Sequence, residues 1–218
     1  MPMNDQNERW TVDSLANEVA RTDRYAGGGA VAAMSLAGAA ATAELVFQLS
    51  AGRRKISEED RGKLKDAVQL CQRLRAIFQH AINEDIAALT ELMDAQSQLR
   101  SARKSDHGAA PELEQRSADA IAAAIETPLR LARDAKRLLR TIDELQCLAR
   151  PFTASDLGAA AATSAGAITS LLLMAEVNLG MITDDVEETR IAQEIDDLYS
   201  QSQDQASRVV ARTRSVIR

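Results

Sequence analysis

One carboxylate lies among apolar side chains in a long amphipathic segment, and it is the clearest candidate for chemistry. At helical spacing, Asp85 shares one face with four large apolar residues: Phe78, Ile82, Leu89 and Leu92. Partial removal from water raises the pKa of a carboxyl group, which suits it to move protons near neutral pH. A structural aspartate, satisfied by a neighbouring helix terminus or an arginine, is the alternative, and the residues alone leave both open.

An amide occupies a similar position further along the chain. Asn178 has apolar helical neighbours, which are Leu171, Met174, Met181 and Ile182. Its side chain can orient a ligand because an amide both donates and accepts hydrogen bonds. The same pattern fits a clamp between two helices, and the residues favour the clamp.

Three consecutive glycines, Gly27, Gly28 and Gly29, precede an uncharged segment with a helical composition. They do not form a nucleotide-binding loop, because the Gly-Lys-Ser/Thr of a Walker motif is missing. A dinucleotide fingerprint is also excluded, because no strand precedes the glycines and their spacing is wrong. What remains is a turn at a helix N-terminus, where free backbone N–H groups can meet a carboxylate or a carbonyl.

Three cations, Arg53, Arg54 and Lys55, cluster where the same segment ends, in the sequence AGRRK. The helix dipole favours positive charge at a C-terminus, which is a sufficient structural reason for the cluster. The alternative is a site for the polyanionic tail of a ligand.

Composition limits the classes of protein and of partner. Aromatic residues make up 3% of the 218, prolines number four, and the formal net charge is −6. This balance favours helices, and the negative charge argues against nucleic acid as a partner. The two cysteines, Cys71 and Cys147, are expected to be reduced, buried thiols, and two histidines are too few for a histidine-based metal site. The first residues show no secretory signal, so a cytoplasmic location is expected.

Apolar periodicity predicts an all-α protein with a single domain over residues 1–218, in which residues 1–10 form a flexible N-terminus. The expected helices cover the following ranges: 11–22, 28–50, a long segment around 64–99, about 121–145, 155–181 and about 186–216. A polar stretch with glycine and proline, residues 101–112, is expected to join the third helix to the fourth. Either Ser155 or Asp156 is expected to cap the fifth helix.

Two stretches of 19 residues, 25–43 and 157–175, carry no charge. Each is long enough to cross a bilayer, but both consist mainly of alanine, glycine, serine and threonine and are weakly hydrophobic. We therefore expect no membrane span. The composition favours two central helices that are buried on all sides and pack closely, and such burial suggests a homo-oligomer.

These features occur in an order that resembles the cyclodeaminase/cyclohydrolase family of folate enzymes. The family's glycine turn and basic run resemble YAGGGAVAA and AGRRK, and its mid-helix D-x-x-A-F is similar to DIAAL at 85–89. Its later motifs resemble AAAIETPLRLA at 122–132, SDLGAAA at 155–161 and MAEVNLGMITD at 174–184. SDLGAAA is the most specific of these, and the resemblance spans about residues 11–216.

The resemblance implies an all-helical homodimer that binds a folate in a cleft beside the glycine turn. By position, Gly27, Gly28 and Gly29 would contact the ligand and Lys55 would lie near it, while the site would be lined by Asp85, Asp156 and Asn178. The interpretation of the basic cluster as a site for an acidic tail adds Arg54. No metal or redox cofactor is required, and the folate is the only small molecule expected.

Two functions of different classes follow. The first is a one-carbon enzyme, a formiminotetrahydrofolate cyclodeaminase or a methenyltetrahydrofolate cyclohydrolase, with Asp85 as general acid/base and Lys55 stabilising charge. The second is a diverged helical binding or scaffold protein that keeps the fold without turnover. The second function is considered because the chain departs from the family's pattern at Ala26, Ala30, Ile56 and Leu89, and because NLGMITD lacks the family's usual proline.

Overall fold

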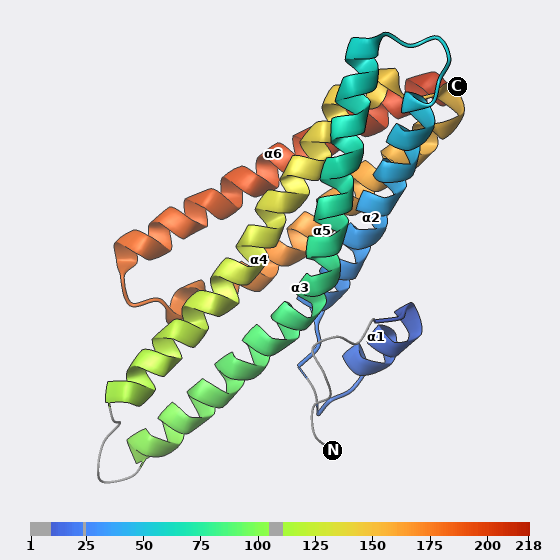
Figure 1. Ribbon diagram of the computed structural model, residues 1–218. Coiled ribbons are helices and arrows are strands. Elements are labelled where there is room, and N and C mark those ends of the chain that lie inside the picture. The colour runs from blue at the N-terminus through green and yellow to red at the C-terminus, as the bar shows by residue number, and fades with distance from the viewer. Residues whose placement is uncertain (1–9, 24, 105–110) are drawn as a thin grey trace.

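The structure is a computed structural model that describes residues 10–23, 25–104 and 111–218. These residues form six α-helices and three short 3₁₀ helices and include no strand, as Figure 1 shows. The α-helices are α1 (Val12–Val19), α2 (Gly28–Ala51), α3 (Glu58–Lys104), α4 (Pro111–Leu145), α5 (Ala154–Glu176) and α6 (Asp185–Ile217). The 3₁₀ helices are η1 (Gln146–Leu148), η2 (Pro151–Thr153) and η3 (Leu179–Met181). The predicted all-α class is confirmed.

The long hairpin of α3 and α4 follows from charge and periodicity. Acidic residues begin α3 and basic residues end it, as the helix dipole favours. Its predicted apolar stripe is buried, with Leu64, Cys71 and Phe78 fully shielded from solvent. The helix continues to Lys104, further than the predicted loop at 101–112 allows, and 105–110 lie outside the described residues. Of the N-terminal residues 1–10 that were predicted to be flexible, residues 1–9 also lie outside them.

The start of α5 differs from the prediction. The N-cap residue is Thr153 and makes no side-chain cap, while Ser155 and Asp156 lie inside the first turn. The Thr153 hydroxyl instead donates to the Arg150 carbonyl, at 3.0 Å, within the preceding 3₁₀ turn. This turn fixes the entry of the chain and replaces the expected cap. The helix also ends at Glu176, before the predicted end at Met181, because the chain turns and forms η3.

The two helices that contain the uncharged stretches, α2 and α5, pack side by side in opposite directions. Gly28 at the start of α2 faces Met174 near the end of α5, whose sulfur lies 3.5 Å from where a Cβ of residue 28 would stand. Alanines on both helices are fully buried, among them Ala33, Ala40 and Ala161. Small side chains therefore allow the two backbones to approach closely, as the composition predicted.

The prediction that both helices are buried on all sides is wrong for the single chain. Val31 and Leu45 on α2 are 44% and 51% exposed, and Leu173 on α5 is 54% exposed. Two spans, Gly28–Ala51 and Pro151–Met181, which contain α2 and α5, are long and apolar enough to cross a membrane. Each has a mean hydropathy of 1.6, and about half of each apolar window is buried inside the protein. One side of each helix faces the bundle and the other is uncovered.

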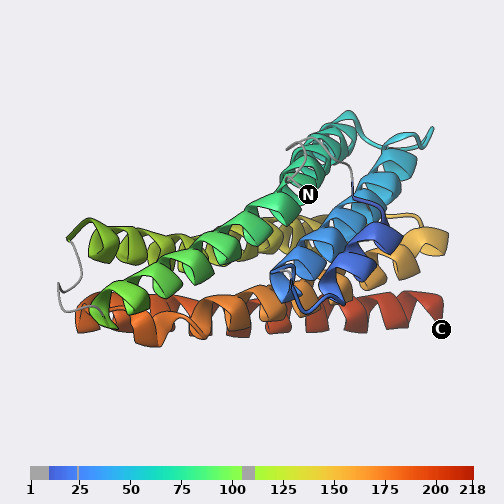
Figure 2. The same cartoon turned by 90° about the horizontal axis from the view of Figure 1, so that it is seen from below.

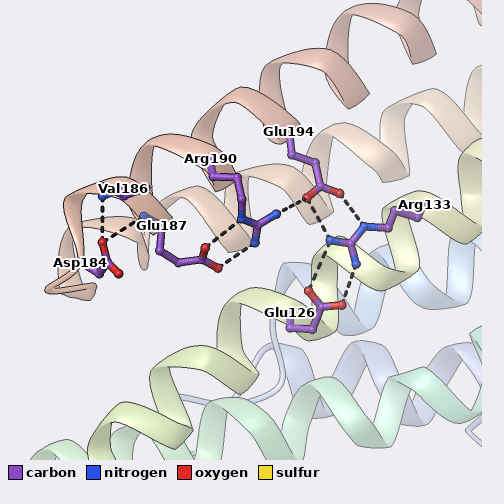
Figure 3. A network of polar contacts seen from close by, with 7 residues as sticks. All are labelled: Glu126, Arg133, Asp184, Val186, Glu187, Arg190 and Glu194. Carbon is purple, nitrogen blue, oxygen red and sulfur yellow. Dashed lines mark hydrogen bonds and ion pairs between the residues drawn. The ribbon is translucent and has the colours of Figure 1, made fainter.

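Charged side chains connect α6 to α4, as Figure 3 shows. Arg133 lies between Glu126 and Glu194, with a nitrogen 2.6 Å from a carboxylate oxygen of each. Hydrogen bonds to these carboxylates raise the pKa of the Arg133 guanidinium. Figure 2 shows α6 running along the whole length of the bundle, and its C-terminus lies at the end where α2 meets α3.

The two cysteines are both free, as expected, but only one is buried. Cys71 lies in the core, where desolvation raises the pKa of its thiol to about 12. The expectation for Cys147 is wrong, because this residue is in η1 near the surface and is exposed.

Candidate functional site

The Asp85 carboxylate lies directly against the start of α2. A Cβ at residue 29 would stand 2.0 Å from its Oδ1 atom, so only glycine leaves room for the carboxylate. The Ala30 backbone N–H donates a hydrogen bond to it. Because Gly27 provides no side-chain cap for α2, a carboxylate from α3 meets the free N–H groups of the first turn. The long-range contact joins two motifs that are 56 positions apart in the sequence.

Two opposing effects act on this carboxyl group. Desolvation is the larger and raises the pKa of Asp85, while the hydrogen bond from Ala30 lowers it. The net result is a pKa above the ordinary value for aspartate. The side chain is half-buried, so it keeps access to solvent or to a ligand. This combination gives a carboxylate with a fixed position and an increased affinity for protons.

Asn178 lies at the same end of the α2–α5 pair as the glycine turn. It is 8% exposed, and its Nδ2 atom donates to the Met174 carbonyl, at 3.0 Å. Asn178 follows α5, and its amide satisfies a carbonyl in the last turn of that helix; within the described residues it forms no hydrogen bond to any other helix. The favoured interpretation as a clamp between helices is wrong. The position near Met174, and thus near Gly28, agrees with the expected grouping with the glycines.

Two contacts beside Asp85 were not expected from the sequence. The Trp10 indole N–H donates to the Asn83 side chain, at 2.7 Å, and so attaches the N-terminal segment to α3 two residues before Asp85. Glu84 pairs with Arg130 from α4, at 2.5 Å. Both pairings join segments far apart in the chain, and periodicity gives no signal for either.

The remaining predicted residues lie at the opposite end of α2. Arg54 and Lys55 follow its last turn, are exposed, and have no ion-pair partner among the described residues. Asp156 lies at the same end, because α5 runs antiparallel to α2. A helix of 24 residues is about 36 Å long. Within one chain, the predicted residues therefore form two groups, a glycine-turn end (Gly27, Gly28, Gly29, Asp85 and Asn178) and a basic end (Arg54, Lys55 and Asp156).

A cleft of about 760 Å³ lies between the far halves of α3 and α4 and the start of α6. Its apolar floor includes Leu99, Ile121 and Ile191, and Arg103 and Arg190 lie at its rim. None of the predicted site residues lines it. The cleft depends on how three distant segments meet, so the sequence offers no local sign of it.

Across the ranges that the structure describes, no group of three His, Cys, Asp or Glu side chains is arranged to hold a metal ion.

Comparison with known proteins supplies an independent assignment. No curated protein sequence matches the chain. A crystal structure of formiminotetrahydrofolate cyclodeaminase from Thermotoga maritima is similar in fold, with a TM-score of 0.83 and 20% sequence identity over 96% of this chain and 98% of that one. The sequence profile of the formiminotransferase-cyclodeaminase family matches residues 11–197, which is most of the chain. The chain therefore belongs to the formiminotransferase-cyclodeaminase family.

Proposed function

We propose that the chain is a folate-dependent one-carbon enzyme, either a formiminotetrahydrofolate cyclodeaminase or a methenyltetrahydrofolate cyclohydrolase. Family membership supports the folate and the one-carbon chemistry. The observation that carries the assignment is the Asp85 carboxylate, held against the backbone of Gly29 with a raised pKa. A proton-transfer group whose pKa is moved toward the working pH is what either reaction requires.

In the cyclodeaminase reaction, a folate amine attacks the formimino carbon and a C–N bond to the departing ammonia breaks. The attacking nitrogen loses a proton and the leaving nitrogen gains one. We propose that Asp85 accepts the first proton and donates the second, so that it ends the cycle in its starting state. The contact of its carboxylate with the backbone of α2 keeps Asp85 in place for both proton transfers.

In the cyclohydrolase reaction, water attacks the methenyl carbon and loses a proton. One C–N bond of the hydroxyl adduct then breaks, the released nitrogen gains that proton, and the adduct hydroxyl loses its proton to solvent as the formyl group forms. Asp85 is then the base that accepts a proton from water. The free N–H groups of the glycine turn are donors for a developing negative charge, and Lys55 stabilises charge or binds the acidic tail. In this proposal Gly27, Gly28, Asp156 and Asn178 contact the folate, and Arg54 contributes to the tail site.

The proposal also covers the location, the oligomeric state and the partners of the protein. We propose a cytoplasmic homodimer that binds no nucleic acid, does not enter a membrane, and uses no cofactor beyond the folate substrate. The net charge of −6 supports the first exclusion. The burial of half of each apolar window against the bundle supports the second.

A second candidate is a helical binding protein of the same fold without turnover. The observation that favours it is the capping contact, because Asp85 supplies the acceptor that the first turn of α2 lacks. A structural role of this kind does not require proton transfer. Asp85→Asn separates the two, since the amide oxygen of asparagine can still accept from Ala30 but the side chain cannot carry the proton.

The experiment is to mix the pure protein with methenyltetrahydrofolate and follow the loss of its absorbance, and to measure folate binding by calorimetry. The enzyme hypothesis expects binding and turnover by the wild type, and binding with greatly reduced turnover by Asp85→Asn. Equal turnover by the variant would show that Asp85 is not the acid/base. Binding without turnover of either folate substrate would favour the second candidate, and no binding of any folate would exclude the proposal.

A further inference from the structure

Three successive residues of α3 each contact a different part of the chain. The Asn83 side chain accepts a hydrogen bond from the Trp10 indole N–H, at 2.7 Å. Glu84 pairs with Arg130 of α4, and Asp85 lies against the start of α2. Successive residues of an α-helix point about 100° apart, so one short stretch can meet three neighbours. The proposed function uses the contact at Asp85, whereas the contact at Asn83 has no role in it.

Trp10 is held by more than its hydrogen bond. Its ring is half-buried and packs against the main hydrophobic core. The next residue, Thr11, caps α1: its hydroxyl accepts from the Ser14 backbone N–H, and the Ser14 hydroxyl accepts from the Thr11 backbone N–H. Leu15 of the same short helix is 3% exposed and belongs to that core. The hydrogen bond to Asn83 therefore comes from a side chain whose position is already set by packing.

The segment that begins at Trp10 leads into the glycine turn. Its described parts are residues 10–23 and 25–29. Its far end meets α3 at Asp85, through Gly29 and the Ala30 backbone N–H. The two ends of the segment therefore contact α3 at positions 83 and 85, within a single turn of that helix. Because both ends are attached to the same rigid helix, the contact at one end restricts where the other end lies.

We propose that Trp10 and Asn83 are positioning residues, whose hydrogen bond holds the segment before the glycine turn to α3 and so keeps the turn against the Asp85 carboxylate. The two side chains act on the reaction through this contact and not by touching the folate. Catalytic groups depend on a fixed separation, since a displacement of about 1 Å can lower a rate by 10²-fold. The effect on turnover rests on the proposed function, whereas the coupling of the two contacts rests on the geometry alone.

The first test observes the Trp10 contact directly and needs no activity. Trp10 is the only tryptophan of the chain, so its fluorescence reports on this contact alone. Asn83→Ala is expected to shift the emission to longer wavelength, because the indole loses its acceptor and becomes more exposed to water. The control is Gln203→Ala, which removes another half-buried hydrogen bond between distant segments, from Gln203 to Thr169 at 3.0 Å. It should leave the emission unchanged.

Amide hydrogen exchange tests whether the two contacts are coupled. The backbone N–H groups of residues 28–30 lie in the first turn of α2, where Asp85 accepts from one of them. Trp10→Phe and Asn83→Ala are both expected to make these amides exchange several-fold faster, because the turn opens locally from the carboxylate. Trp10→Phe keeps an aromatic ring in the core, so it decides the matter if Asn83→Ala fails to fold. Gln203→Ala should exchange as the wild type does at these positions.

Kinetics with formiminotetrahydrofolate test the positioning role. Trp10→Phe and Asn83→Ala are each expected to lower kcat by about 10-fold and to change KM by less than about twofold, because the contact fixes catalytic groups. The double variant should be no slower than the slower single variant, since both substitutions remove the same hydrogen bond. Gln203→Ala should keep the wild-type kcat.

The pH profile separates positioning from a general loss of active protein. When the turn moves away, Asp85 regains water, and the desolvation that raises its pKa becomes weaker. The acid limb of kcat/KM should therefore move to lower pH in Trp10→Phe and Asn83→Ala. Glu84, the charged neighbour in sequence, keeps its partners Arg130 and His80, which neither substitution touches. A smaller fraction of active protein would lower the rate and leave the limb in place.

The outcomes distinguish this proposal from the proposed function. Unchanged exchange at residues 28–30 in both variants, or an equal increase in Gln203→Ala, would overturn the coupling. Faster exchange with wild-type kcat, or with an unmoved acid limb, would overturn the positioning role in an active enzyme. An inactive wild type whose variants still show faster exchange would refute the enzyme function and leave the coupling supported.

Discussion

The two ends of α2 carry the two parts of the candidate site and differ in burial, in packing and in charge. At the glycine-turn end, the Asp85 carboxylate is packed against Gly29 and Ala30 and is half-buried. At the basic end, Arg54 and Lys55 are exposed and unpaired in the described chain. The Asp85 carboxylate is held in place and has a raised pKa, whereas the Arg54 and Lys55 side chains are exposed to solvent.

This difference indicates that the two ends have different roles in the candidate site. A buried, positioned carboxyl group is suited to proton transfer, while exposed cations are suited to binding an acidic group by long-range attraction. It also shows that residues whose motifs belong together need not be adjacent in one chain. Within one chain, a helix of about 36 Å keeps them apart.

The largest effect is expected at the glycine-turn end. Asp85→Asn should lower kcat by about 10²–10⁴-fold, because proton transfer by a positioned side chain contributes that much. Folate binding and helicity should be retained, since the amide can still cap α2. Steady-state kinetics with calorimetry and circular dichroism measure all three. A variant that also fails to fold would assign Asp85 a structural role.

At the basic end, Lys55→Ala is expected to lower kcat/KM by about 10²-fold, as loss of one charge-stabilising donor does. Lys65→Ala, which removes an exposed cation from α3, should change it little. Rates measured at increasing salt test the difference, because added salt screens attraction by an exposed charge. A Lys55→Ala enzyme as active as the Lys65→Ala control would remove the basic end from the site.

The glycine turn offers a graded test of how tightly the carboxylate is held. Gly29→Ala should destabilise the protein by about 1–3 kcal/mol, because a methyl group would overlap Asp85. Gly28→Ala should cost much less, because Met174 is at ordinary contact distance and has a flexible side chain. Denaturant unfolding of both variants gives the comparison, and equal stabilities would contradict the packing described for Asp85.

A structural glycine near the basic end provides the contrast. A Cβ at Gly158 would lie 2.8 Å from the Thr213 side chain, so Gly158→Ala should lower stability by roughly 1–2 kcal/mol through the α5–α6 contact. Gly166→Ala, which has open space, should instead stabilise α5 by roughly 0.5–1 kcal/mol. Thermal unfolding distinguishes them. Loss of turnover in folded Gly158→Ala would mean that this end of α5 acts beyond packing.

The smallest effect is on stability as a function of pH. Because the folded-state pKa of Asp85 is raised, its ionisation disfavours the folded state, and this cost appears as pH rises from about 3.9 through the folded-state pKa. Asp85→Asn should therefore be slightly more stable than the wild type near neutral pH. The difference should disappear in acid, below the unfolded-state value. Unfolding curves at several pH values would contradict this if the wild type were the more stable at neutral pH.

The fold was largely predictable because apolar periodicity is a local property. The apolar stripe that contains Leu64, Cys71 and Phe78 predicted α3. The uncharged stretches in α2 and α5 predicted that these two helices pack against each other. The errors occurred where turn geometry sets a helix end or where contacts between distant segments set the exposure of a side chain. Thr153 begins α5 through a 3₁₀ turn, and the exposed Val31 and Leu45 depend on which neighbours the single chain can supply.

The candidate site was predictable only in part. The apolar surroundings of Asp85 indicated a desolvated carboxyl group, and its pKa is raised as expected. The contact with Gly29 could not be read from either motif, because it depends on how α2 meets α3. The hydrogen bond between Trp10 and Asn83 could not be predicted for the same reason. The separation of Lys55 from the glycine turn became clear only from the length and direction of α2.

The central claim, that Asp85 moves the proton in a folate reaction, is tested most directly by the pH dependence of kcat/KM for the wild-type protein with formiminotetrahydrofolate. The carboxylate must be ionised to accept the first proton, so activity should fall as pH drops through its raised pKa. We predict an acid limb centred above the ordinary aspartate value of about 3.9. Turnover that stays constant down to that value, or no turnover at any pH, would contradict the account.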